Sequence, residues 1–242
     1  MTGISILFLG FLLGMKHATE ADHLAAVATL ATRQHSLAQT MKQGIAWGIG
    51  HTVTLIIFGG VVLALGKSIP EHMAQALELA VGIMLVVLGL DVLRRLVRSR
   101  VHFHVHAHVS GAQHVHAHSH FGEGLHRASR HRHPHPTPQP FPLRALAVGM
   151  MHGMAGSAAL ILLSLEAVQS LSMGLMYIIL FGAGSIVGMA LLSLVIAIPL
   201  RLSASRLAWL HKGMTAAVGG FSCLIGAVMV YRIGFVERLL LG

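Results

Sequence analysis

Residues 4–31 read ISILFLGFLLGMKHATEADHLAAVATLA, an apolar run that charged residues and histidines interrupt near its middle. A helix that spans a bilayer needs about 20 predominantly apolar residues, so this run is long for a single span. Lys16, Glu20 and Asp22 lie inside it, and a charged side chain at the centre of a bilayer is energetically costly. We therefore expect a membrane helix that breaks, or leaves the lipid, near its middle.

The rest of the chain has the same apolar character. Of the 242 residues, 55% are hydrophobic and only 10% are charged. A water-soluble domain of ordinary composition carries about 25% charged residues. Further stretches long enough to span a bilayer lie at 45–66, 75–93, 143–166, 173–200 and 213–234. The sequence therefore predicts an all-α integral membrane protein with six transmembrane helices, and it excludes an ordinary water-soluble enzyme.

The lysines and arginines are distributed unevenly between the two sides that six spans define. Most of them fall in the connections within 33–42, 94–144 and 201–212. Cytoplasmic loops of membrane proteins carry an excess of lysine and arginine. The sequence therefore predicts a multi-pass protein of the cell (inner) membrane, with the central loop cytoplasmic and both termini outside. Because the basic residues lie in connections rather than on one folded face, we do not expect nucleic acid as a partner.

The central loop, 94–142, is rich in histidine and ends in a proline-rich tail. Such a composition predicts a disordered segment. Every second side chain of an extended strand lies on one side, so two or three imidazoles there can bind one divalent cation. A solvated basic linker is the alternative. The histidines expected to buffer metal are His102, His104, His106, His108, His114, His116, His118 and His120.

The two halves of the chain match each other in three places, in the same order and at nearly the same offset. Because each half holds three spans, the second would enter the membrane upside down relative to the first. Inverted repeats are typical of transporters, whose substrate site lies near the bilayer midplane and often at broken helices. The sequence thus predicts two inverted three-helix repeats, 1–93 and 143–242, although helix packing between small residues is an alternative source of the matches. The matched segments are Gly14-Met-Lys-His17 with Gly149-Met-Met-His152, Trp47-Gly-Ile-Gly50 with Phe181-Gly-Ala-Gly184, and Ala80-Val-Gly82 with Ala217-Val-Gly219.

The polar residues of the first span form a candidate metal site. His17, Glu20, Asp22 and His23 each offer a lone pair, and imidazole with carboxylate suits nickel, cobalt or zinc. At about 100° per residue, an unbroken helix would place His17 and His23 about 240° apart. Either the helix opens here, or the residues divide between direct ligands and residues that orient the ligands. A buried polar cluster of purely structural use is the alternative.

The segment His17-Ala-Thr-Glu-Ala-Asp22-His23 fits the H-x4-D-H signature, and in this the chain resembles the nickel/cobalt transporter superfamily. That superfamily includes uptake permeases, nickel/cobalt efflux proteins with a histidine-rich loop, and urease-accessory transmembrane proteins. Gly50-His51-Thr52 looks like its second histidine motif, and His152-Gly-Met-Ala-Gly156-Ser157 looks like a segment of the urease-accessory branch. The resemblance implies that His17, Asp22 and His23 bind metal and are essential.

Other residues are added to this set as candidates. His51 and His152 are expected to be further ligands or to line the ion path, although a lone membrane histidine can simply bond a neighbouring helix. We expect Glu20 to orient the histidines from one helical turn away. The remaining candidates for orienting or path roles are Thr52, Ser157 and Ser185.

The leading functional hypothesis is transport of Ni²⁺, and also of Co²⁺, through the His/Asp site, as uptake that supplies nickel enzymes. The ion is then cargo, and no prosthetic group is expected. Expected partners are the divalent ion, the lipid bilayer, and cytoplasmic nickel chaperones or urease accessory proteins. These residues do not fix the direction, so nickel/cobalt efflux for metal resistance is an alternative. A membrane metallochaperone for urease-type enzymes is another.

Enzymatic activity is not expected, because the sequence has neither an H-E-x-x-H motif nor an evident pair of nucleophile and base. The one cysteine excludes a disulfide framework, a Cys-based zinc site and a dithiol relay. Met15 and Met150 flank the two matched histidines, which leaves a Cu(I) path as a weaker alternative.

Overall fold

The structure is a computed structural model that describes residues 3–34, 36–65, 70–98, 101–107, 113–119, 141–167, 170–237 and 239. Most of it is helical. Helix α1 is followed by a short α2, and the other helices are longer. A short π-helical turn, η1, continues α7. The helices are α1 (Gly3–His17), α2 (Ala21–Ala31), α3 (Leu37–Leu65), α4 (Glu71–Arg98), α5 (Leu143–Ala167), α6 (Leu171–Arg206), α7 (Ala208–Tyr231) and η1 (Arg232–Val236).

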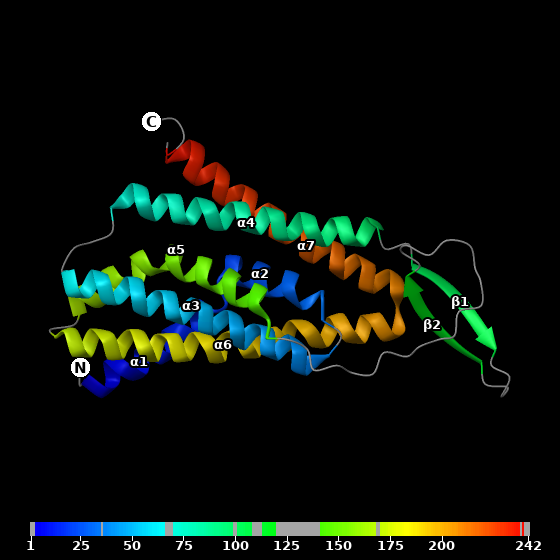
Figure 1. The fold of residues 1–242 in the computed structure, drawn as a ribbon, viewed down its shortest axis with the longest axis horizontal. Coiled ribbons are helices and arrows are strands. Elements are labelled where there is room, and N and C mark those ends of the chain that lie inside the picture. The colour runs from blue at the N-terminus through cyan, green and yellow to red at the C-terminus, as the bar shows by residue number, and fades with distance from the viewer. Residues whose placement is uncertain are drawn as a thin grey trace.

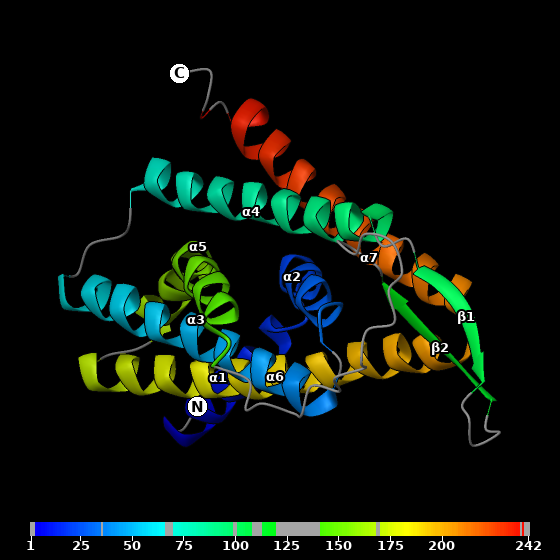
Figure 2. The same ribbon diagram turned by 45° about the vertical axis from the view of Figure 1, so that its right-hand side comes forward.

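The helices form a bundle in which α2 lies between two pairs. Helices α4 and α7 cross along one side, and α3 and α6 run along the other (Figure 1). After a 45° turn, α2 is still seen between these pairs, beside α5 (Figure 2). This arrangement surrounds the short helix with longer ones, so most of the α2 side chains are buried.

Among the described residues, four helices are long and apolar enough to cross a membrane by length and composition. They correspond to α3, α4, α6 and α7 with η1, whereas α1 and α2 are shorter apolar helices. Large apolar side chains such as Ile57, Val87 and Val195 are exposed on the outer faces of these helices. Exposed apolar area of that extent fits a lipid environment. The chain is thus a helical membrane protein, as the sequence predicts.

The predicted break in the first apolar run is confirmed. Helix α1 ends at His17, and α2 begins at Ala21 after a turn. In this turn the Thr19 hydroxyl donates to the Lys16 carbonyl at 2.6 Å. Glu20 then adopts an extended conformation (φ −64°, ψ 151°), which changes the chain direction before α2 starts. Two short helices therefore replace one long helix.

Glycines allow α1 to approach α6, and α5 to approach α3, in the same manner. A Cβ at Gly14 would collide with the Phe181 carbonyl, and a Cβ at Gly149 would collide with the Trp47 carbonyl. These are matched residues of the two halves. The return contacts are matched as well, because Gly50 lies against the Leu146 carbonyl and Gly184 against the Phe11 carbonyl. Close backbone approach through small residues is how membrane helices pack.

At the crossing of α4 and α7, glycines of each helix pack against glycine carbonyls of the other helix. A Cβ at Gly82 or Gly226 would press on the carbonyl of the other, at 3.2 and 2.5 Å. Gly89 and Gly219 face each other in the same way, at 2.6 and 3.2 Å. Nearby, the Ser222 hydroxyl donates to the Leu85 carbonyl at 2.8 Å. Helix α4 from the first half is thus held against α7 from the second half.

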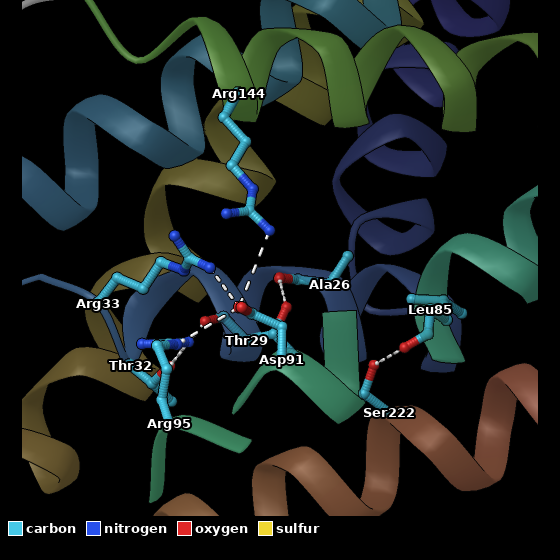
Figure 3. A network of polar contacts seen from close by, with 9 residues as sticks. All are labelled: Ala26, Thr29, Thr32, Arg33, Leu85, Asp91, Arg95, Arg144 and Ser222. Carbon is cyan, nitrogen blue, oxygen red and sulfur yellow. Dashed lines mark hydrogen bonds and ion pairs between the residues drawn. The ribbon is translucent and has the colours of Figure 1, made fainter. Parts of the chain in front are cut away.

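An ion cluster joins three helices at one end of the bundle. The Asp91 carboxylate of α4 accepts a hydrogen bond from Arg33, which follows α2. Arg95 of α4 lies 3.3 Å from the same oxygen, and Arg144 at the start of α5 lies 3.9 Å from it (Figure 3). We call this the Asp91 cluster, and the end of the bundle that holds it the basic end.

Part of the segment 94–142, for which the composition predicts disorder, has regular secondary structure. Helix α4 continues to Arg98, and strands β1 (Val101–Ala107) and β2 (Gln113–Ser119) pair antiparallel. The physical reason is that alternating histidines with β-branched and aromatic residues also suit a strand. His108 and His120 lie outside the described residues, as do 120–140. The register places His102 opposite His118, His104 opposite His116, and His106 opposite His114.

Candidate metal centre

Four histidines from four helices converge in the interior of the bundle. They are His17 at the end of α1, His23 in α2, His51 in α3 and His152 in α5. None is more than 6% exposed. The His23 ring lies in the middle, with ring centroids 4.4 Å from His17, 5.4 Å from His51 and 4.9 Å from His152. We call this set the four-histidine cluster.

The helix break brings His17 and His23 together. On an unbroken helix these side chains would point in different directions. The turn between α1 and α2 instead lets both rings face the same interior space, where their centroids are 4.4 Å apart. The sequence leaves two arrangements possible, a helix that opens or residues divided between direct ligands and orienting residues. The structure has the helix break.

Carboxylates hold the Nδ1 sides of two of these rings. Glu20 Oε1 lies 2.9 Å from His17 Nδ1, and Asp22 Oδ1 lies 2.9 Å from His23 Nδ1. A carboxylate that accepts the Nδ1 proton leaves the lone pair of the ring on Nε2. This pairing is common for metal-binding histidines, because it fixes the tautomer and the orientation of the ring.

The opposite sides of the rings have no hydrogen-bond partner among the described residues. The Nε2 atoms of His17, His23 and His152, and both ring nitrogens of His51, make no hydrogen bond to the described part of the chain. A buried polar group without a partner costs about 1–3 kcal/mol. Several such atoms facing one space are costly for a purely structural cluster, whereas a metal ion would satisfy them.

Two groups of donor atoms are close enough to hold an ion. One consists of His17, His23 and His51, and the other of Asp22, His23 and His152. Within each group the donor atoms lie within 4.8 Å of one another. His23 belongs to both groups. With imidazoles and a carboxylate and no thiolate among these donors, the site suits borderline divalent ions such as nickel, cobalt or zinc.

A comparison with curated proteins finds a relative that is similar along almost its whole length. The urease accessory protein UreH of Bacillus sp. (strain TB-90) is 36% identical over 236 residues, which cover 98% of this chain and 95% of that relative. The chain belongs to the nickel/cobalt transporter family. No family model matches the chain, and no solved structure matches it. The resemblance inferred from the H-x4-D-H motif is thereby confirmed.

In this family member, the Asp22 carboxylate lies between His23 and His152. Its Oδ1 contacts His23 Nδ1 at 2.9 Å, and its Oδ2 lies 3.7 Å from His152 Nε2. The carboxylate can therefore orient His23 and also reach an ion bound beside His152. The sequence motif predicts Asp22 as a metal ligand. The structure adds that its carboxylate also lies near His152.

Sequence reasoning missed two aromatic residues that border the cluster. The Trp47 ring lies 5.3 Å from both His23 and His152, centroid to centroid. The Phe181 ring lies 5.4 Å from His17. The signal was present, because Trp47 and Phe181 are matched residues of the two halves. Large rings at this place would exclude water and limit the space around a bound ion.

The hydroxyl residues expected near the path bond to neighbouring helices. Thr52 donates to the Gly182 carbonyl at 3.1 Å, and Ser185 donates to the Gly14 carbonyl at 3.3 Å. Both bonds strengthen the glycine contacts of α6 with α3 and α1. Ser157 lies in α5, and its side chain is outside the described part of the structure.

Proposed function

We propose that this protein carries Ni²⁺, and also Co²⁺, across the membrane through the four-histidine cluster. The observation that supports this most is the set of buried imidazoles whose Nε2 atoms lack partners beside a broken helix. Neutral imidazole is the commonest ligand of such ions. The ion is cargo, and His17, His23, His51 and His152 hold it in transit with Asp22.

The bundle is proposed to consist of two inverted three-helix repeats. In support, Gly14 packs against the Phe181 carbonyl in the same way as Gly149 packs against the Trp47 carbonyl. At the α4–α7 crossing, Gly82 packs against the Gly226 carbonyl and Gly226 against the Gly82 carbonyl. Two units related in this way can rock against each other about a site at their interface. His152 comes from the second half and the other three histidines from the first, so rocking would open the cluster to either side.

The membrane orientation follows from charge. We propose that the basic end faces the cytoplasm of the cell (inner) membrane, with both termini outside. The Asp91 cluster brings Arg33, Arg95 and Arg144 to that end. An excess of basic residues marks the cytoplasmic side of membrane proteins. The histidine-rich hairpin follows α4 closely in the chain, which supports the same side for it.

Uptake that supplies nickel enzymes is the proposed direction. Its support is the similarity to a relative that is named for a urease accessory role. Cytoplasmic nickel chaperones or urease accessory proteins are the partners that would receive the ion. No covalent chemistry is proposed for the chain, which acts by binding and moving an ion.

Metal buffering by the hairpin is proposed as a separate, accessory role. The register pairs three histidines of β1 with three histidines of β2. Directly opposed residues of an antiparallel pair have Cβ atoms about 4.5–5.5 Å apart, which suits two imidazoles on one ion. Deleting 101–119 tests the metallochaperone alternative, because a transporter keeps most of its flux and a chaperone loses its effect.

Nickel accumulation in intact cells tests the proposed function. Cells that express the wild type or His17→Ala at equal levels are loaded with radioactive nickel. More nickel with the wild type than with the variant supports uptake through this site, and less nickel supports efflux. His72→Ala is the matched control, since His72 is an exposed histidine of α4 outside the cluster. Equal accumulation in wild type and His17→Ala would overturn transport of nickel through the site.

A further inference from the structure

A narrow crevice adjoins the four-histidine cluster on the side of the basic end. It lies between α2, α3 and α6, and its polar lining consists of Thr40, Gln43, Trp47 and Ser193. Apolar residues of α2 form the remaining wall. None of its lining residues belongs to the groups that could hold the ion. The crevice is therefore a feature that the proposed site does not use.

Two polar atoms on this lining are buried without a hydrogen-bond partner in the part of the chain that the structure describes. They are the amide oxygen of Gln43 and the indole Nε1 of Trp47. The hydroxyls beside them are satisfied within their own helices, because Thr40 donates to the Ser36 carbonyl and Ser193 to the Met189 carbonyl. One unpartnered atom is an acceptor and the other a donor. Water or a hydrated cation can satisfy both, whereas tightly packed side chains cannot.

Trp47 separates the crevice from the cluster. Its ring lies 5.3 Å from the rings of His23 and His152, and it also lines the crevice. Gln43 is one helical turn before Trp47 on α3, and Thr40 lies further toward the basic end. The crevice thus extends along α3 from the cluster toward the end of α2, where Arg33 bonds Asp91.

The crevice is closed in this conformation. No space within it is wide enough for a water molecule. Gly44 lines its narrow part, where a Cβ would collide with the Ser193 hydroxyl and come within 2.7 Å of the Met189 carbonyl. Helices α3 and α6 are therefore in direct backbone contact at this point, and a small separation of the two helices would open a polar route.

We propose that this crevice is the route of the ion between the four-histidine cluster and the basic end. Trp47 is the plug at the cluster, and the Gln43 amide oxygen receives the ion through its hydration water. The inference rests on the proposed function and adds the path to it. It assigns Gln43 and Trp47 as residues that govern passage rather than binding.

Cysteine labelling tests the route directly. The chain has a single cysteine, Cys223, so Cys223→Ser provides a background without thiols. In that background, Gln43→Cys and Ser193→Cys are treated with a charged methanethiosulfonate in sealed vesicles of each orientation. We expect labelling from the side of the basic end only, and slower labelling when Ni²⁺ is present. Ile49→Cys is the matched control, because Ile49 lies on the outer face of α3 and is 37% exposed.

The labelling result overturns the route in either of two cases. One is that Ser193→Cys does not react although nickel flux in the same vesicles is intact. The other is that the crevice cysteines react no faster than Ile49→Cys and Ni²⁺ does not slow them. Neither case argues against transport through the four-histidine cluster. The proposed function fails by a different result, namely equal nickel accumulation in the wild type and His17→Ala.

A second measurement separates passage from binding. Gln43→Leu removes the amide oxygen, while Gln43→Asn retains an amide on a shorter side chain. We expect Gln43→Leu to lower nickel flux about tenfold, with Ni²⁺ affinity of the purified protein within about twofold of the wild type. Gln43→Asn should recover part of the flux. Unchanged flux in Gln43→Leu, or an equal loss of flux and affinity, would overturn the role assigned to Gln43.

Discussion

The four-histidine cluster and the Asp91 cluster are two concentrations of polar side chains that join helices, and they are built in opposite ways. In the first, buried rings leave their Nε2 atoms without partners. In the second, one carboxylate that is 34% exposed has three arginines around it. The Asp91 cluster has an excess of positive charge close to solvent. The four-histidine cluster has an excess of lone pairs in the interior.

This difference in burial and in hydrogen bonding indicates which of the two clusters is the better candidate for binding a ligand. Exposed ion pairs contribute about 0–1 kcal/mol each, because water screens them and their side chains lose entropy. In the Asp91 cluster, Arg95 Nε makes no hydrogen bond within the described part of the chain, but it lies 3.3 Å from the Asp91 carboxylate in an ion pair. Unpartnered nitrogens in the interior cost more than that, which supports the proposal that they bind a cation. Substitutions in the two clusters should accordingly affect different measurements.

The largest effect is expected from His23→Ala. His23 belongs to both groups of donor atoms, so its loss removes a ligand from each. We expect Ni²⁺ affinity to fall more than about 100-fold, beyond the range typical of residues that only orient ligands. His51→Ala and His152→Ala should each lose less, since each belongs to one group. Equilibrium dialysis of the purified proteins measures this, and equal losses for all three would contradict a shared His23.

A smaller loss is expected from Asp22→Asn. The amide can still accept from His23 Nδ1, but the negative charge between His23 and His152 is gone. We expect Ni²⁺ affinity to fall about 10–100-fold, as for other residues that support metal ligands. Glu20→Gln is the companion variant. Its side chain is 57% exposed, so the charge is screened and the loss should be smaller. A larger loss for Glu20→Gln would argue against the central place of Asp22.

In the Asp91 cluster, Asp91→Asn should change stability and not metal affinity. It leaves three guanidinium groups near one another without their shared carboxylate. Because all four side chains are partly exposed, we expect a loss of about 1 kcal/mol. Thermal unfolding in detergent measures the loss, and Ni²⁺ binding should stay at the wild-type value. A marked drop in affinity would mean that the two clusters are coupled.

The smallest effect is expected from Arg144→Ala. Its guanidinium lies 3.9 Å from the carboxylate and is 48% exposed, so it makes the longest of the three contacts. We expect a change in stability of less than about 0.5 kcal/mol, within the range of surface substitutions. Arg33→Ala should cost more, because Arg33 hydrogen-bonds the carboxylate directly. A reversed order in parallel melting curves would contradict this ranking.

Much of the candidate site could be predicted from local sequence. The interruption of 4–31 by Lys16, Glu20 and Asp22 predicts the helix break, because charge inside an apolar run is costly. His51 and His152 were found as membrane histidines in matched segments. Trp47 and Gln43 were not found as site residues, since a tryptophan or glutamine in a span has many ordinary uses. The composition of 101–119 suits both disorder and a strand, so local sequence does not decide between them.

The sequence by itself determined that this is a helical membrane protein with a metal-binding motif at a broken first helix. These properties follow from local hydropathy and from the chemistry of neighbouring side chains. Only the tertiary structure decided that His51 and His152 face His23, that Asp22 reaches two histidines, and that Trp47 separates the cluster from a crevice. These relations depend on how α3 and α5 cross, and that crossing depends on close backbone contacts at Gly50 and Gly149 between residues far apart in the chain.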